Sequence, residues 1–144
     1  MLNDSLSGDL CIICRMHFNA AHRLYNPKFS NEKNFAIFGK CNNENGHGHN
    51  YVIEIYVKGS IDPETGFIIN LSDLKAIIDK EIIQECDHKN LNLDVTWLKN
   101  VIPTTENLVI AFWKRIKNKI SKGKLYKIRL YETENNIAEY SELN

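Results

Sequence analysis

The stretch from His47 to Lys58 alternates, one residue at a time, between two sets of side chains. The first set begins with two histidines and continues with large apolar side chains: His47, His49, Tyr51, Ile53, Ile55 and Val57. The second set is more polar and includes Asn50 and Glu54. Such alternation is typical of a strand with one buried face, because residues two apart on a strand point to the same side. We therefore expect a strand over 47–58 that presents two imidazoles side by side.

A second alternating row precedes this strand and ends in a third histidine. Its members are apolar up to the last: Leu10, Ile12, Cys14, Met16, Phe18, Ala20 and His22. If the two strands are neighbours, His22 lies beside His47 and His49. Catalytic zinc sites use about three protein ligands, often imidazoles, and keep one position open. The spacing thus predicts a metal site at the three histidines. The alternative is a polar strand end beside a core histidine whose hydrogen bonds are satisfied.

Turn and capping residues divide the rest of the chain into further elements. Strands are expected at 9–22, 47–58, 67–69, 125–132 and 137–141, with a hairpin turn at 62–66 before the third. Helices are expected at 71–86, capped by Asn70, and at 105–120, with Gly123 as a C-cap. A long polar loop is expected at 27–39. The order indicates an α+β fold, an antiparallel sheet backed by two helices.

Length and charge narrow the class of protein. The 144 residues suit a single domain at 9–144 after a flexible tail at 1–8. The 18 basic and 18 acidic side chains balance, so neither nucleic acid nor a membrane is an expected partner. A secretory signal and a membrane-spanning run are both lacking, so we expect a soluble cytoplasmic protein whose four cysteines stay reduced. The expected partner is a small molecule or another copy of the chain.

Three further groups could carry chemistry. Cys41 could act as a base or nucleophile if its thiol lies beside the metal. Asp87 and His88 could supply an acid–base group and the residue that orients it. Because they are consecutive, we expect them to complete a site with Cys41 rather than touch each other. The alternative is a helix end closed by polar residues. Glu132 ends an apolar strand face and is most simply a strand-end carboxylate.

Six short motifs occur in a specific order along the chain. They are 18–24 (FNAAHRL), 38–43 (FGKCNN), 46–51 (GHGHNY), 87–91 (DHKNL), 104–107 (TTEN), and 125–127 (LYK) with 131–133 (YET). Together they resemble the 6-pyruvoyl-tetrahydropterin synthase family, and the resemblance extends from about residue 10 to residue 140.

This resemblance implies a fold, an assembly and a set of site residues. The fold is the tunnelling fold, in which strands of three subunits form a barrel and two trimers stack as a homohexamer. The implied zinc ligands are His22, His47 and His49. The implied catalytic residues, at a site shared between subunits, are Cys41, Asp87 and His88. The implied anchor for the pterin ring is Glu132, with Thr104, Thr105 and Glu106 beside it.

The reaction implied by the resemblance converts 7,8-dihydroneopterin triphosphate to 6-pyruvoyl-tetrahydropterin with loss of triphosphate, in tetrahydrobiopterin-type biosynthesis. Relatives that cleave the side chain for folate synthesis carry a glutamate instead of the cysteine, so Cys41 argues against that activity. Relatives that make 6-carboxy-tetrahydropterin for queuosine share the cysteine, the histidines and the Asp-His pair. The spacing between Cys41 and His47 and the 87–91 motif look closer to the pyruvoyl enzymes. The carboxy enzyme and a catalytically silent pterin-binding hexamer remain the alternatives.

Overall fold

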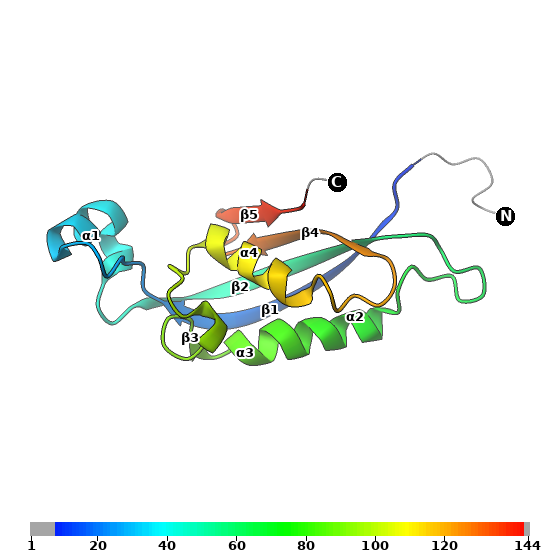
Figure 1. Cartoon of the computed structure of the whole chain (residues 1–144), viewed down its shortest axis with the longest axis horizontal. Helices are drawn as coiled ribbons and strands as arrows, with labels where there is room; N and C mark the ends of the chain where they lie inside the picture. The colour runs from blue at the N-terminus through cyan, green and yellow to red at the C-terminus, as the bar shows by residue number, and fades with distance from the viewer. Residues whose placement is uncertain (1–7, 143–144) are drawn as a thin grey trace.

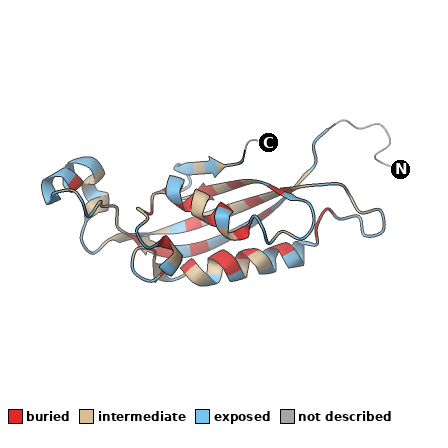
Figure 2. Ribbon diagram, viewed as in Figure 1, coloured by how far each residue is buried: buried red, intermediate tan, exposed pale blue. Residues whose placement is uncertain are grey.

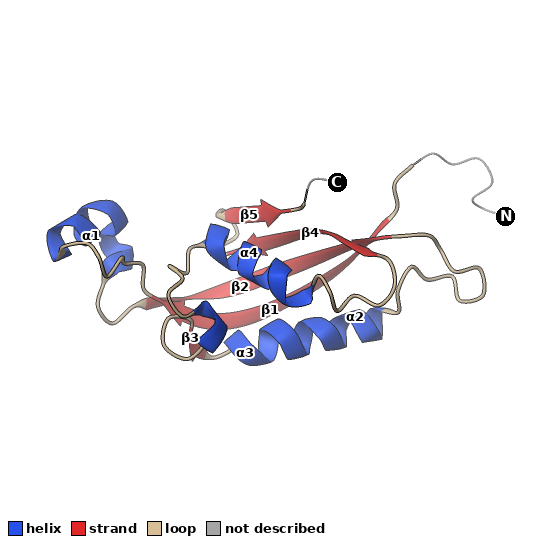
Figure 3. Cartoon of the chain, in the orientation of Figure 1, coloured by secondary structure: helices blue, strands red, loops and turns tan. Residues whose placement is uncertain are grey.

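The computed structural model describes residues 8–142, which form one five-stranded sheet with helices packed on one face and one further helix that projects beyond the end of the sheet (Figure 1). The strands are β1 (Cys11–His22), β2 (His47–Lys58), β3 (Lys89–Asn90), β4 (Lys124–Tyr131) and β5 (Ile137–Tyr140). The helices are α1 (Asn31–Phe38), α2 (Leu71–Ile78), α3 (Gln84–Cys86) and α4 (Thr105–Ile116), as Figure 3 shows. The expected tail at 1–8 lies outside the described residues except for Gly8. Residues 143 and 144, the last two of the expected domain, also lie outside them.

The sheet has the strand order β3-β1-β2-β4-β5. Strands β1 and β2 pair antiparallel along their whole length, and β4 and β5 continue the antiparallel arrangement. The short strand β3 runs parallel to β1, so the sheet is mixed and the expectation of a purely antiparallel sheet is wrong at this edge. The backbone N–H groups of His88 and Leu91 donate to the carbonyls of Asn19 and Ala21, which ties the chain after α3 to this edge.

The core lies between the sheet and the helices, where the expected alternating rows are buried. Figure 2 shows buried positions recurring along β1, β2 and β4 and on the inner sides of α2 and α4. The largest fully buried side chains include Tyr51, Phe18 and Phe112. The rings of Phe18 and Tyr51 stack with their centroids 4.9 Å apart. The face predicted to be apolar therefore packs as expected, and it carries the histidines at one end of the sheet. In residues 8–142 no helix has the length and apolar character needed to cross a membrane.

The helical caps explain where the two predicted helices begin. The Asn70 side chain accepts a hydrogen bond from the backbone N–H of Ser72, and Thr104 accepts one from Asn107. The first predicted helix continues from α2 through a π-helical turn (Asp79–Ile83) into α3. The second ends at Ile116 rather than at 120. Gly123, with a φ of +70°, lies in the turn that leads into β4 and does not cap the helix.

One loop prediction and one strand prediction are wrong. The segment expected as a long loop contains α1, which begins where the Ser30 side chain accepts a hydrogen bond from the Lys33 N–H. A 3₁₀ turn, η1 (Gly39–Asn42), follows it. The expected third strand at 67–69 does not form. Its turn does, because the Asp62 N–H donates to the Phe67 carbonyl, but the residues that follow are buried by packing instead of by strand pairing.

A register shift in the sheet changes which side chains of β4 face the core. Between Tyr56 and Val57 the pairing of β2 with β4 skips one residue of β4, so that Val57 lies opposite Leu125 and Tyr56 opposite Lys127. The skipped residue, Tyr126, belongs to the alternating row that ends at Glu132, but it is exposed, and Leu125 is buried in its place. A bulge of this kind turns the side chains before it to the other face.

Candidate metal centre

Three histidines converge at the end of the sheet where β1 stops and β2 starts. The register pairs His22 with His47 and Ala20 with His49, so the imidazoles come from two adjacent strands. One potential ligand atom from each ring lies within 4.8 Å of the other two, and the Nε2 atoms of His22 and His47 are 3.2 Å apart. The predicted juxtaposition of the three histidines is therefore confirmed. The cluster could hold a metal ion.

The ring of His22 is held from behind by the backbone. It is fully buried, and its Nδ1 lies 2.9 Å from the carbonyl oxygen of Pro103 and 3.3 Å from the Tyr51 hydroxyl. A carbonyl can only accept, so Nδ1 carries the proton and donates to it, which leaves the Nε2 lone pair for a ligand in front. Histidine ligands are commonly oriented through their second nitrogen in this way.

The chemistry of His49 also suits a metal. Its Nε2 atom is buried and has no hydrogen-bond partner among the described residues. A carboxylate oxygen, Glu132 Oε1, lies 3.7 Å away, which is too long for a hydrogen bond. Buried polar atoms are normally satisfied, and a coordinated ion would satisfy this one. This orphaned nitrogen favours a metal site over the alternative of histidines with satisfied hydrogen bonds.

The electrostatics of the cluster keep the imidazoles in the form that binds metals. Burial lowers the pKa of His22 and of His49, although the nearby Glu132 carboxylate opposes this shift. Metal ligation requires the neutral imidazole. At neutral pH both rings therefore present a free lone pair.

We expect the metal-free protein to lose stability as the pH falls below about 6.5. Unfolded histidines take up protons near that pH, whereas folded His22 and His49 do so only at lower pH. The unfolded state then binds more protons, so stability is fully present above pH 6.5 and declines as the pH falls through the folded pKa values. Thermal melts of metal-free protein at pH 7.5 and 5.5 measure this loss. The exposed His17 supplies the control: a His17→Gln variant should keep the wild-type pH dependence, whereas His49→Gln should show less of it.

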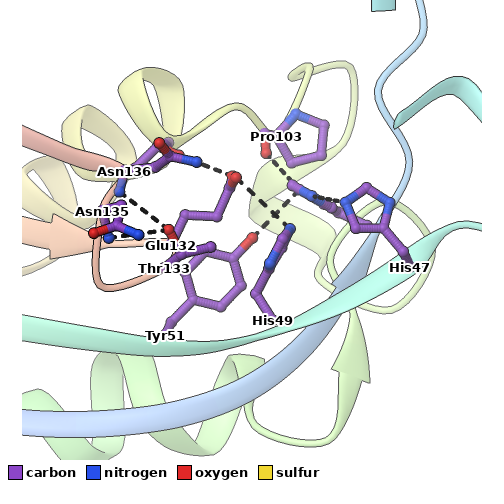
Figure 4. A network of polar contacts seen from close by, with 10 residues as sticks. His47, His49, Tyr51, Pro103, Glu132, Thr133, Asn135 and Asn136 are labelled. Carbon is purple, nitrogen blue, oxygen red and sulfur yellow. Dashed lines mark hydrogen bonds and ion pairs between the residues drawn. The ribbon is translucent and has the colours of Figure 1, made fainter. Parts of the chain in front are cut away.

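The carboxylate of Glu132 lies beside the histidines at the end of β4. Its Oε2 accepts a hydrogen bond of 2.9 Å from the Thr105 hydroxyl at the start of α4, and its other oxygen faces His49. Figure 4 shows the Glu132 and His49 side chains turned toward each other above Tyr51. A pocket of about 730 Å³ opens here, lined by Leu24, Thr104, Thr105, Glu106, Glu132, Asn135, Asn136, Ile137, Ala138 and Glu139. The four residues predicted to bind substrate thus line one pocket.

Asp87 and His88 touch each other, contrary to our expectation. Asp87 Oδ2 lies 2.9 Å from His88 Nδ1, and Asp87 Oδ1 accepts a hydrogen bond from the Asn19 N–H. This is possible because His88 has a left-handed backbone, with a φ of +58°. The Asn19 N–H, followed by the His88 side chain, holds the pKa of the Asp87 carboxyl below its usual value. The His88 side chain is 82% exposed, so it can meet a group from outside its own chain.

Cys41 lies in the turn η1, just ahead of β2. It is a half-buried free thiol, and its backbone carbonyl accepts a hydrogen bond from the Leu24 N–H. In the described part of the chain, no hydrogen bond joins Cys41 to Asp87 or His88. Of the three residues predicted to be catalytic, only Asp87 and His88 are thus seen in direct contact within one chain.

Sequence reasoning missed the groups that orient the site. The Pro103 carbonyl and the Asn19 N–H are backbone atoms, and no residue type marks them. Tyr51 did carry a signal, because it belongs to the same alternating row as His47 and His49.

Replacing Gly46 by alanine should destabilise the protein and displace His47. Gly46 has a φ of +71°, and an added Cβ would lie 2.8 Å from the His22 carbonyl oxygen. The strained backbone alone costs about 1–3 kcal/mol, and the collision adds to that. Gly66 is a matched control, since its φ is +76° but a Cβ there meets nothing within 4 Å. Urea unfolding should show a larger loss for Gly46→Ala than for Gly66→Ala; equal losses would contradict the close packing around His22.

Comparison with known proteins gives consistent matches over almost the whole chain. The profile of a family described as 6-pyruvoyl tetrahydropterin synthase matches residues 11–143. A 6-pyruvoyl tetrahydrobiopterin synthase of Homo sapiens is 48% identical over 126 residues, which cover 88% of this chain and 87% of that protein. One of Drosophila melanogaster is 45% identical, covering 88% and 76%. The solved structure of Caenorhabditis elegans 6-pyruvoyl tetrahydropterin synthase is similar with a TM-score of 0.88 and 37% identity, covering 94% of this chain and 97% of that one.

Proposed function

The chain belongs to the 6-pyruvoyl tetrahydropterin synthase family, and we propose that it converts 7,8-dihydroneopterin triphosphate to 6-pyruvoyl-tetrahydropterin with loss of triphosphate. The product would serve tetrahydrobiopterin-type biosynthesis. The observation that carries this proposal is the three-imidazole cluster directly beside the pocket of Glu132. The cation site could thereby hold one end of a small substrate, its side chain, while the Glu132 carboxylate accepts hydrogen bonds from the other end, the ring.

The reaction needs no external oxidant or reductant. One alcohol carbon of the side chain is oxidised to a ketone while the ring gains two hydrogens. Triphosphate leaves from the terminal carbon as its neighbour loses a proton, and the resulting enol becomes a methyl ketone. Atoms and electrons therefore balance within the substrate, and the protein has only to bind the substrate and move protons.

The metal ligands in this proposal are His22, His47 and His49, and the metal is zinc. Zinc enzymes use three protein ligands and an open position, and an all-imidazole set suits this ion. Bound there, zinc would polarise the side-chain oxygens of the substrate and acidify the adjoining C–H bonds. The pocket of Glu132, on one side of the cluster, would hold the rest of the molecule.

Proton transfer is assigned to Cys41 and to the Asp87–His88 pair. As thiolate, Cys41 would accept a proton from the side-chain carbon. Asp87 holds His88 Nδ1, which leaves His88 Nε2 free to exchange a proton with the thiol or the substrate. The carboxylate of Glu132 would accept two hydrogen bonds from the pterin ring, one from the exocyclic amine and one from a ring N–H. Thr104, Thr105 and Glu106 would line the ring-binding side of the pocket.

A site shared between subunits would reconcile Cys41 with the exposed His88. The edge of β1 supports association, because β3 covers only Ala20 and Ala21 among its described residues. The backbone groups of Asn19 bond to Asp87 and His88, but among the described residues no strand pairs with that edge over residues 11–18, which could pair with a strand of another copy. We therefore include the homohexamer, two stacked trimers with barrels formed across subunits, in the proposed function.

Replacing Glu132 by glutamine should weaken substrate binding by about 10- to 100-fold, because a hydrogen bond to a charged group contributes about 1.5–3 kcal/mol. Metal content should stay unchanged. Calorimetric titration with 7,8-dihydroneopterin triphosphate in a Cys41→Ala background avoids turnover during the measurement. A Glu134→Gln variant, altered in the exposed turn that follows Glu132, should bind like its parent. Unaltered affinity in Glu132→Gln would remove Glu132 from the ring-binding site.

The activity is tested by identifying the product. Purified protein incubated with 7,8-dihydroneopterin triphosphate should release triphosphate and a pyruvoyl-tetrahydropterin, identified by mass and by reductive trapping. A carboxy-tetrahydropterin would instead assign the chain to the queuosine-type reaction. Binding without any product would indicate a silent pterin-binding protein.

A further inference from the structure

Arg23, directly after His22, has a backbone that is fixed in two directions. Its N–H donates to Asn92 Oδ1 at 2.7 Å, and its carbonyl accepts from Asn92 Nδ2 at 2.9 Å. Both backbone groups of Arg23 are thus satisfied by one side chain from the segment after β3. The base of the Arg23 side chain is consequently held in a defined position next to the metal cluster.

The guanidinium of Arg23 binds the turn that contains Cys41. Its Nε donates to the Asn42 carbonyl at 2.9 Å, and one terminal nitrogen lies 3.4 Å from Asn42 Oδ1. The guanidinium carbon lies 4.4 Å from the centre of the Tyr25 ring, so the group is stacked as well as hydrogen-bonded. The next residue, Leu24, donates its N–H to the Cys41 carbonyl at 2.8 Å. Two consecutive residues therefore bind two consecutive residues of η1.

Burial and capping do little to hold the turn η1 in place. None of its residues is fully buried, and no side chain caps its start. The preceding helix α1 extends away from the sheet, and its only buried residue is Asn34 (Figure 1). The position of Cys41 relative to the sheet therefore depends mainly on contacts with the end of β1.

We propose that Arg23 is a positioning residue, which fixes the Cys41 turn relative to the three histidines instead of binding the triphosphate. The proposal rests on the proposed function for the role of Cys41. A misplacement of about 1 Å in a reacting group can lower turnover by about 100-fold. We call the contacts of the Arg23 guanidinium with Asn42 and Tyr25 the clamp. Loss of the clamp should accordingly reduce kcat and leave the affinity for the anionic substrate nearly unchanged.

Replacing Arg23 by lysine or by glutamine distinguishes a residue that positions the turn from one that binds triphosphate by its charge. A lysine keeps the positive charge but cannot donate from a planar fork or stack on Tyr25 in the same way. If Arg23 clamps the turn, Arg23→Lys and Arg23→Gln should behave alike. If Arg23 binds triphosphate as a charge, Arg23→Lys should retain most of the affinity and Arg23→Gln should lose it.

The experiment combines amide hydrogen exchange with steady-state kinetics on zinc-loaded protein. In both variants the amides of residues 39–46 and of Leu24 should exchange about 10- to 100-fold faster, as expected when a hydrogen bond to a charged group is lost. The amides of β2 should stay protected, which confirms folding, and zinc content should be unchanged. We expect kcat to fall by about 10- to 100-fold with KM altered less than about threefold.

Two further variants keep the test decisive. Lys40→Gln removes a charge from the same turn without touching the clamp, so exchange at 39–46 should match the wild type. Asn92→Ala frees the Arg23 backbone and should speed exchange in the same segment. Unchanged exchange in Arg23→Gln, together with a raised KM that Arg23→Lys restores, would overturn the proposal. If the wild-type protein made no product, the proposed function would fail, and the exchange data would still decide whether Arg23 holds the turn.

Discussion

Replacing Cys41 by alanine is expected to lower kcat by about 10²- to 10⁴-fold, the usual contribution of a general acid or base, while the protein keeps its metal. The Cys41 thiol does not belong to the three-histidine cluster that could hold the metal. The side chain is half-buried in a short turn, so its removal leaves no large cavity in the core. In this variant, activity should therefore be lost while the metal content stays unchanged. Turnover is measured by triphosphate release, and metal by atomic emission.

Cys11 provides the control for Cys41. It is also a half-buried free thiol, but it lies at the other end of β1 from His22. Cys11→Ala should retain wild-type turnover. A Cys41→Ala variant that turned over normally would remove the thiol from the reaction, and one that lost its metal would show that Cys41 belongs to the metal site.

Replacing His49 by alanine is expected to weaken metal binding by more than about 100-fold, the upper range for residues that merely orient a ligand. One of three imidazoles would be missing, and the remaining two cannot complete the site. His49 is preferable to His22 for this test, because the loss of fully buried His22 would also leave the Pro103 carbonyl unsatisfied. Activity should fall together with metal content.

Zinc affinity can be measured through stability as well as by competition with a chelator. A ligand at 1,000 times its Kd stabilises the folded state by about 4.1 kcal/mol, and this gain shrinks as Kd rises. The thermal shift caused by a fixed zinc concentration should be large in the wild type and in His17→Ala, and small in His49→Ala. Equal shifts in all three proteins would place the metal elsewhere.

The central strands and the histidine cluster could be predicted because side chains that alternate along a strand must point to alternate faces of the sheet. Strand β2 starts and ends where the alternation does, and the row that ends in His22 fixes which residue faces His47. The cap at Asn70 likewise marked the start of α2. At these positions the local sequence preference and the long-range packing favour the same structure, so the sequence pattern alone was sufficient to predict it.

Other features could not be read from the sequence for identifiable reasons. Helix α1 buries only Asn34 and so has no apolar stripe to reveal it. The bulge at Tyr126 changes which side chains of β4 face the core without a change in residue type. The contact between Asp87 and His88 depends on a left-handed backbone at a histidine, which spacing does not indicate. Completion of the site by a second copy remains a prediction.

In the proposed function, three histidines hold a metal on which a pterin triphosphate reaction depends. The most direct test measures product formation and metal content in the same sample during removal and return of zinc. We predict that a chelator abolishes formation of 6-pyruvoyl-tetrahydropterin from 7,8-dihydroneopterin triphosphate, and that about one zinc ion per chain restores it in the wild type but not in His49→Ala. Undiminished product formation by protein shown to be free of metal would contradict the proposed role of the metal.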